Sequence, residues 1–129
     1  MKILNAKICS NGQIFDGEVT VDGERIASVT PKETSSSLDE TIIDAKGMYV
    51  IPGLLDVHFH GCVGYDTCDA SKEAFDKIAA YEGSEGVLAI CPATMTYPED
   101  KLSEIMDIAA DYESPEGADF VGLHLEGPF

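Results

Sequence analysis

Two histidines separated by a single residue, His58 and His60, are the most chemically specific feature of this sequence. They lie at the end of the mostly apolar run 54–59, which we expect to form a strand buried on both faces because its apolar residues hardly alternate with polar ones. Every second residue of a strand faces the same side, so both imidazoles can reach one metal ion through neutral nitrogen atoms. The spacing alone leaves open that one histidine belongs to the core and the other to the surface.

A second pair of polar residues, His124 and Glu126, lies at the end of the apolar run 120–125. A carboxylate at such a position is costly unless its charge is compensated, as a metal ion would do; a solvated glutamate is the alternative. His124 shares a strand face with Glu126, and we expect it to support a metal ligand or to be a hydrogen-bonded core histidine rather than to bind metal itself. Folds that alternate strands and helices place their sites at such strand ends.

The four cysteines are Cys9, Cys62, Cys68 and Cys91, and no C-x-x-C pair occurs among them. A zinc site built from cysteines is therefore not expected. No export signal is visible at the N-terminus, so we expect reduced thiols in a cytoplasmic protein. Cys62, next to the histidine pair, could be a nucleophile, but its favoured interpretation is a small buried side chain that fills space.

Charge is the strongest deviation in composition, with 24 acidic against 8 basic residues and a formal net charge of −16. A surface this acidic repels phosphate backbones and anionic lipids, so we expect neither a nucleic-acid nor a membrane partner. No apolar run approaches the roughly 18 residues of a membrane span. The charges otherwise indicate a soluble globular protein.

The N-terminal part of the chain has the pattern of a small antiparallel sheet. Asn11-Gly12 and Asp22-Gly23 are typical of tight hairpin turns, and the Ser-rich stretch 31–40 predicts an exposed loop. Short strands are expected at residues 2–9, 14–21, 25–29, 41–44 and 48–51.

The pattern changes at Pro52-Gly53, after which apolar strands alternate with amphipathic helices. We expect strands at 54–59, 87–90 and 120–125, and helices at 71–82 and 98–112. This order predicts an α/β unit whose three strands are parallel and adjacent in sequence order. We expect Ser71 to cap the first helix, Gly83 and Gly86 to end it, and Pro98 to open the second. The buried stripes of the two helices are expected at Ala74, Phe75, Ile78 and Ala79, and at Leu102, Ile105, Met106 and Ala109.

Several of these motifs together resemble a known family. Residues 52–61 (PGLLDVHFHG) closely resemble the start of the barrel in the amidohydrolase superfamily. Residues 62–66 (CVGYD) and 122–129 (GLHLEGPF) narrow the resemblance to the N-acetylglucosamine-6-phosphate deacetylases. Residues 92–96 (PATMT) also resemble that family's second barrel strand. The resemblance covers essentially the whole chain.

The fold that this resemblance implies is a TIM-type (β/α)₈ barrel with a small β-sandwich domain. Residues 1–53 match the N-terminal part of the sandwich, and residues 54–129 match the first three strands and two helices of the barrel. A barrel of this kind needs roughly 250 residues. The chain is therefore either a fragment of a longer enzyme or a truncated, non-catalytic product. Intact strand spacing favours a fragment, which we expect to be inactive alone.

The reaction that the resemblance implies is hydrolysis of the acetamide of N-acetylglucosamine 6-phosphate to glucosamine 6-phosphate and acetate, in amino-sugar catabolism. It implies one or two divalent metal ions, such as zinc or iron, and a homo-oligomer of the complete enzyme. Glu126 matches the family's metal-binding glutamate, and His58 and His60 match ligands of members that hold two metals. We expect His124 and Asp56 to support these ligands.

No catalytic residue is assigned within the chain. The family's general acid and base is an aspartate late in the barrel, expected beyond Phe129, as are the groups that hold the sugar phosphate. A dihydroorotase or hydantoinase relative remains an alternative, although those enzymes usually bridge their metals with a modified lysine on the fourth strand. A non-catalytic binding module is the other alternative.

Overall fold

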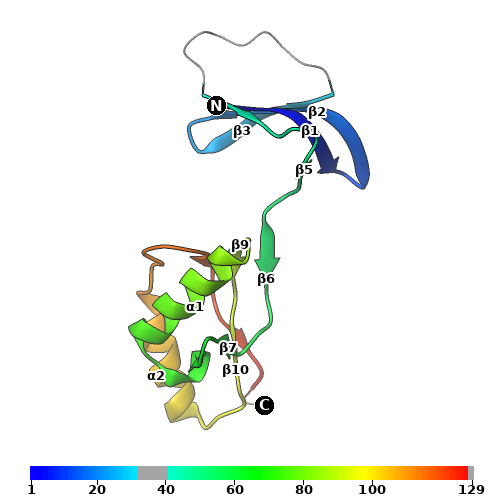
Figure 1. The fold of residues 1–129 in the computed structure, drawn as a ribbon. Helices are drawn as coiled ribbons and strands as arrows, with labels where there is room; N and C mark the ends of the chain where they lie inside the picture. Colours follow the sequence, from blue (N-terminus) through cyan, green and yellow to red (C-terminus); the bar gives the residue numbers. More distant parts are fainter. Residues whose placement is uncertain (32–40, 128–129) are drawn as a thin grey trace. The chain divides into compact units, whose positions relative to one another are not determined.

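The computed structural model describes residues 1–31 and 41–127, and the chain divides into two compact units, Met1–Pro52 and Gly53–Phe129 (Figure 1). It has a mixed α/β fold with many short strands, as expected. Within the described residues, no helix is long and apolar enough to span a membrane. The expected loop at 31–40 lies outside the described residues except for Pro31, and so do Pro128 and Phe129.

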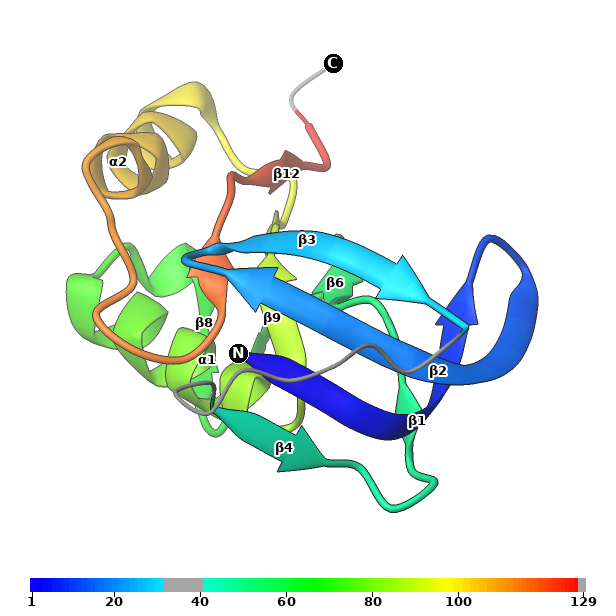
Figure 2. The ribbon, with the colours of Figure 1, turned by 90° about the horizontal axis from the view of Figure 1, so that it is seen from above.

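The first unit is a five-stranded sheet with the order β3-β2-β1-β4, and β5 also pairs with β1 (Figure 2). The two expected hairpins are present, and Asn11 and Gly12 have the positive φ angles, 50° and 73°, that a tight two-residue turn needs. Its core consists of Ala6, Ile8, Val19 and Ala45. The strands are β1 (Lys2–Ser10), β2 (Gln13–Asp22), β3 (Arg25–Thr30), β4 (Ile42–Asp44) and β5 (Tyr49–Val50).

The expectation of an entirely antiparallel sheet is wrong for two strands. Both β4 and β5 run parallel to β1. A parallel neighbour requires a crossover rather than a hairpin, and the chain between β1 and β4 is long enough to supply one. Alternation of apolar residues reports which face a side chain occupies, not the direction of its strand, so the sequence pattern could not reveal this.

The second unit contains the parallel sheet that the sequence predicts. Strands β6 (Leu54–Asp56), β9 (Val87–Ile90) and β11 (Asp119–Phe120) are parallel and adjacent in sequence order. The expected strand 120–125 is interrupted, however, and its second part, β12 (His124–Leu125), pairs in parallel with β10 (Ala93–Thr94). Between β11 and β12 lies Gly122, whose φ of 156° favours glycine.

The helices of this unit are α1 (Lys72–Ser84) and α2 (Glu99–Ala110). Ser71 caps α1 as expected, because its hydroxyl accepts a hydrogen bond from the Ala74 N–H. Its whole expected stripe is buried, but α1 continues through Gly83 instead of ending there. On α2, Leu102 and Ile105 are buried, whereas Met106 is exposed, so the expected stripe is narrower.

A cluster of three rings lies where α1, the segment after α2 and strand β11 (Asp119–Phe120) meet. Phe75 of α1 lies 5.2 Å from Tyr112 and 5.3 Å from Phe120 between ring centroids. Tyr112 and Phe120 are themselves 5.2 Å apart. Aromatic pairs at these separations add to the stabilisation that burial alone provides.

The run that was expected to be buried on both faces is not. Leu54 and Leu55 of β6 are 50% and 55% exposed, and Leu88 of β9 is 61% exposed. Burial on both faces requires a packed layer on each side, and the side chains of the two helices form their clusters with Ile90 and Phe120 instead. The sequence pattern reports the apolar character of the strand, not the presence of a covering layer.

Gly83 provides a test of how α1 packs. Alanine normally stabilises a helix relative to glycine by about 1 kcal/mol. A Cβ at Gly83, however, would lie 2.5 Å from the Gly117 Cα, which is backbone and has little room to move. Because overpacking costs about 1–3 kcal/mol and the helix gain offsets about 1 kcal/mol of it, Gly83→Ala should lower the free energy of unfolding, measured by urea denaturation, by up to about 2 kcal/mol. Lys77→Ala, at an exposed position of the same helix, should change it by less than about 0.5 kcal/mol.

Candidate metal centre

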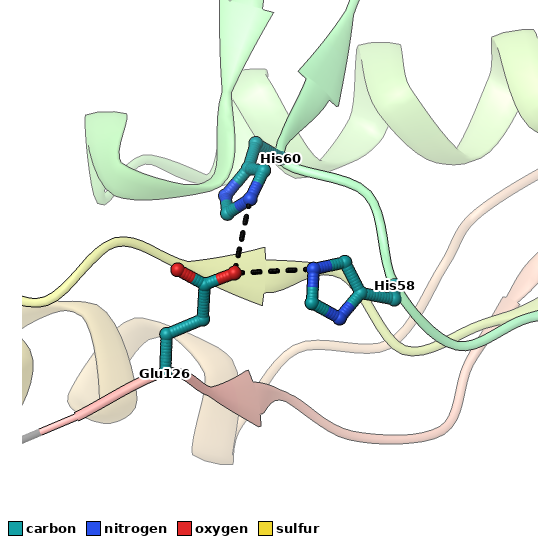
Figure 3. A group of neighbouring side chains, drawn as sticks. All are labelled: His58, His60 and Glu126. Carbon is teal, nitrogen blue, oxygen red and sulfur yellow. Dashed lines mark ion pairs between the residues drawn. The ribbon is translucent and has the colours of Figure 1, made fainter.

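Three side chains of the second unit converge at the end of the parallel strands (Figure 3). The Glu126 Oε1 lies 3.1 Å from the His58 Nε2 and 3.3 Å from the His60 Nε2. One ligand atom from each residue lies within 4.8 Å of the others. The structure thus brings together the three residues that the sequence singles out as metal ligands.

The histidine pair does not lie on a strand, contrary to expectation. Strand β6 ends at Asp56, and residues 57–60 have no regular structure. The segment is nevertheless held in place, because its carbonyl groups accept hydrogen bonds from the next strand. The Cys91 N–H donates to the Asp56 carbonyl at 2.8 Å, and the Ala93 N–H donates to the Phe59 carbonyl at 2.7 Å. The first bond precedes His58 and the second lies between the two histidines, so the segment is tied to the neighbouring chain at both points.

Glu126 is positioned by the pairing of β12 with β10. In this pairing Ala93 lies opposite His124, and the His124 N–H donates to the Pro92 carbonyl at 2.9 Å. One residue beyond β12, the Glu126 carbonyl accepts a hydrogen bond of 3.4 Å from the Thr96 hydroxyl. The glutamate therefore extends from a short but well-anchored strand.

Asp56 and His124, which we expected to support the ligands, both contact His58. The Asp56 Oδ1 accepts a hydrogen bond of 3.0 Å from the His58 N–H. The His124 ring lies edge-on to the His58 ring, with 4.5 Å between the centroids. His124 is exposed, so the alternative of a core histidine is wrong. A supporting role for both residues stays a prediction.

The electrostatics around Cys62 argue against its use as a nucleophile. Burial raises the pKa of the Cys62 thiol to about 11, and the neighbouring Glu82 carboxylate acts in the same direction. A thiol with this pKa is almost entirely protonated near pH 7, and the thiolate is the reactive form. All four cysteines are free.

The donor set fits a divalent metal that prefers nitrogen and oxygen. Two imidazole nitrogens and one carboxylate oxygen make up the three-ligand set of many catalytic zinc sites, and iron accepts the same donors. The Glu126 side chain is 30% exposed and carries the only negative charge of the three-residue group. One polar atom of the group is unsatisfied: the His60 Nδ1 is buried, with no hydrogen-bond partner among the described residues.

Sequence reasoning missed the residue that holds His60. The His60 carbonyl accepts hydrogen bonds of 2.8 Å from both the N–H and the hydroxyl of Thr67. Thr67 opens the short 3₁₀ turn η1 (Thr67–Asp69), which Asp66 caps. The spacing of Asp66 and Asp69 resembles a capping box and could have located this turn in the sequence.

Comparison with known proteins extends these observations. No family model matches the chain. The N-acetylglucosamine-6-phosphate deacetylase of Bacillus subtilis is 29% identical over 96% of the chain and 33% of its own length. The human deacetylase is 30% identical over 100% of the chain and 33% of its own length. A crystal structure of the Thermotoga maritima deacetylase, 30% identical, matches 100% of the chain and 32% of its own, with a TM-score of 0.79.

The chain matches the N-terminal third of the N-acetylglucosamine-6-phosphate deacetylases. In fold alone, the deacetylase of Pasteurella multocida agrees as well, with a TM-score of 0.84 at 23% identity over 99% of the chain and 34% of that protein. The resemblance found in the sequence is thereby confirmed, and the chain spans about a third of the length of the relatives it matches.

Other amidohydrolases are also similar to the chain. A dihydroorotase of Staphylococcus epidermidis is 34% identical over 100% of the chain and 34% of its own length. A D-hydantoinase of a Bacillus species shares the fold, with a TM-score of 0.64 at 22% identity over 96% of the chain and 26% of that protein. The comparisons therefore support amidohydrolase homology more broadly than a single substrate.

Glu126→Gln tests the proposed ligand set. The substitution removes the charge while almost keeping the shape, so it should weaken zinc binding by more than the roughly 10- to 100-fold expected for loss of an outer partner. Zinc titration and metal analysis of the purified protein measure this. Glu99→Gln, at an exposed glutamate on α2, is the matched control and should bind zinc normally. Full zinc content in Glu126→Gln would contradict the assignment.

Proposed function

We propose that this chain is the metal-binding N-terminal portion of an enzyme that hydrolyses the acetamide of N-acetylglucosamine 6-phosphate to glucosamine 6-phosphate and acetate. The observation that carries the proposal is the contact of one Glu126 oxygen with both histidines of the H-x-H pair. Support comes from the similarity to N-acetylglucosamine-6-phosphate deacetylases that match nearly the whole chain. In this proposal residues 1–53 contribute to a β-sandwich and residues 54–129 to a (β/α)₈ barrel.

His58, His60 and Glu126 would hold the divalent ion, with zinc and iron as the candidates. When bound, such an ion polarises a carbonyl group and lowers the pKa of water toward neutrality. Glu126 supplies the charge that favours a cation between the two imidazoles. The His58 side chain is 50% exposed, so the centre is open to a substrate from that side.

Proton transfer requires a further group. Amide nitrogen leaves poorly as an anion and has to be protonated by a general acid. Among residues 1–31 and 41–127, the metal-binding group contains no aspartate and no carboxylate other than Glu126. The resemblance to the deacetylases implies an aspartate for this proton transfer, and we propose that it lies outside residues 1–129.

Recognition of the phosphate is also assigned elsewhere. A phosphate group calls for arginine or lysine side chains. The lysines of the second unit all lie on its helices and not on the segments that carry the candidate metal centre: Lys72 pairs with Asp76 at 2.8 Å, Lys101 pairs with Glu104 at 2.9 Å, and Lys77 is exposed on α1. With 24 acidic and only 8 basic residues, the chain offers few cationic groups for a phosphate, which agrees with phosphate recognition by another part of the protein.

A second candidate function is hydrolysis of a cyclic amide, as in dihydroorotases and hydantoinases. Its support is the 34% identity to a dihydroorotase over the full chain. The position of Glu126 after the third strand of the parallel unit favours the deacetylase, because the cyclic-amide enzymes are expected to use a modified lysine on a later strand. A non-catalytic module would need neither metal nor substrate.

Substrate assays distinguish these functions. In the longest natural protein that contains residues 1–129, we expect acetate release from N-acetylglucosamine 6-phosphate and no opening of dihydroorotate or hydantoin. A chelator should abolish activity, and added zinc or iron should restore it. Glu126→Gln should lower kcat/KM by a factor on the order of 10² or more. Ring opening without acetate release would instead support the second candidate, and residues 1–129 alone should release no acetate.

A further inference from the structure

The two candidate histidine ligands are supported in different ways. The His58 ring lies against the His124 ring, and its backbone N–H is bound by Asp56. The His60 ring has no comparable hydrogen bond on its second nitrogen, because its Nδ1 is buried without a partner among the described residues. Metal-binding histidines usually donate that second N–H to a neighbouring acceptor, which fixes the orientation of the ring. For His60, the orientation has to be set through the backbone.

The carbonyl group of His60 is held by a single residue, Thr67. The His60 carbonyl oxygen accepts one hydrogen bond from the Thr67 N–H and one from the Thr67 hydroxyl, both 2.8 Å long. A carbonyl oxygen has two lone pairs, so these two bonds use its full accepting capacity. Thr67 is completely buried, which shields both bonds from competing water.

Thr67 is itself rigidly placed. Asp66 caps the turn by accepting a hydrogen bond of 2.7 Å from the Cys68 N–H, and Asp69 accepts one of 2.9 Å from the Asp66 N–H. The short hairpin of β7 (Gly61–Cys62) and β8 (Tyr65–Asp66) joins His60 directly to this turn. The branched Cβ of threonine also restricts its side-chain rotation. The hydroxyl therefore presents a fixed donor to the carbonyl of the ligand.

We propose that Thr67 is a positioning residue for the metal centre, whose hydroxyl sets the orientation of His60 through that residue's carbonyl group. The inference rests on the proposed function, because it takes His60 as a metal ligand. Thr67 contacts neither the metal nor the substrate. Its effect is transmitted along one residue of backbone to an imidazole whose Nδ1 has no hydrogen-bond partner among the described residues.

The test is cobalt binding by the purified protein with Thr67→Val, which keeps the shape and the N–H but removes the hydroxyl. We expect Co²⁺ affinity to fall about tenfold and the visible absorption bands of the bound Co²⁺ to change. Thr67→Ser keeps the hydroxyl and should restore both. Thr20→Val is the control, since Thr20 is a half-buried threonine on β2 of the first unit and belongs to none of the elements that carry the metal centre. Its affinity and spectrum should equal those of the wild type.

A double-mutant cycle separates positioning from general damage to the fold. In a His60→Asn background, Thr67→Val should weaken Co²⁺ binding no further, because the residue that it orients is already lost. An equal loss in both backgrounds would overturn the proposal, and so would an unchanged affinity and spectrum in Thr67→Val. If Thr67→Val does not fold, Thr67→Ala takes its place with the same expectations. Normal Co²⁺ binding by Glu126→Gln would instead show that the assignment of the metal ligands is wrong, which is a failure of the proposed function and is distinct from a failure of the Thr67 proposal.

Discussion

The parallel pairing of β10 with β12 is the constraint on which the candidate centre depends. It is only two residues long on each strand, yet it places Glu126 against a histidine pair that precedes it by more than sixty residues. The hydrogen bond from the His124 N–H to the Pro92 carbonyl fixes the register. Because side chains alternate along a strand, a slip of one residue would turn the carboxylate away from both imidazoles.

Much of this arrangement could be predicted from local sequence, and the exceptions have a common cause. The cap at Ser71 and the stripe of α1 depend on neighbouring residues, so their chemistry is visible in the sequence. The convergence of His58, His60 and Glu126 followed from the rule that parallel strands end at one edge. The direction of β4 and the exposure of Leu54 depend on which segments pack together, and no local pattern records that.

The H-x-H motif is symmetrical in sequence but not in structure. His58 contacts side chains from either side of it in the chain, Asp56 and His124, and its own side chain is half exposed. His60 is 36% exposed and is held through its carbonyl group by a residue of the following turn. The spacing of the motif therefore identifies the candidate ligands, but it does not indicate how strongly the surrounding structure restrains each of them.

In the proposed centre, the different surroundings of His58 and His60 affect the free energy of metal binding differently. Without a metal, each Nε2 can carry a proton and donate it to the Glu126 oxygen at 3.1 or 3.3 Å. A metal requires both Nε2 atoms to be bare, which moves the proton of each neutral imidazole to its Nδ1. Water can accept that hydrogen bond at the half-exposed His58. At His60 the Nδ1 is buried with no acceptor among the described residues, and an unmet donor there costs about 1–3 kcal/mol. In the proposed centre, the buried Nδ1 of His60 would therefore limit the affinity for metal, and a group that accepts its N–H would strengthen binding.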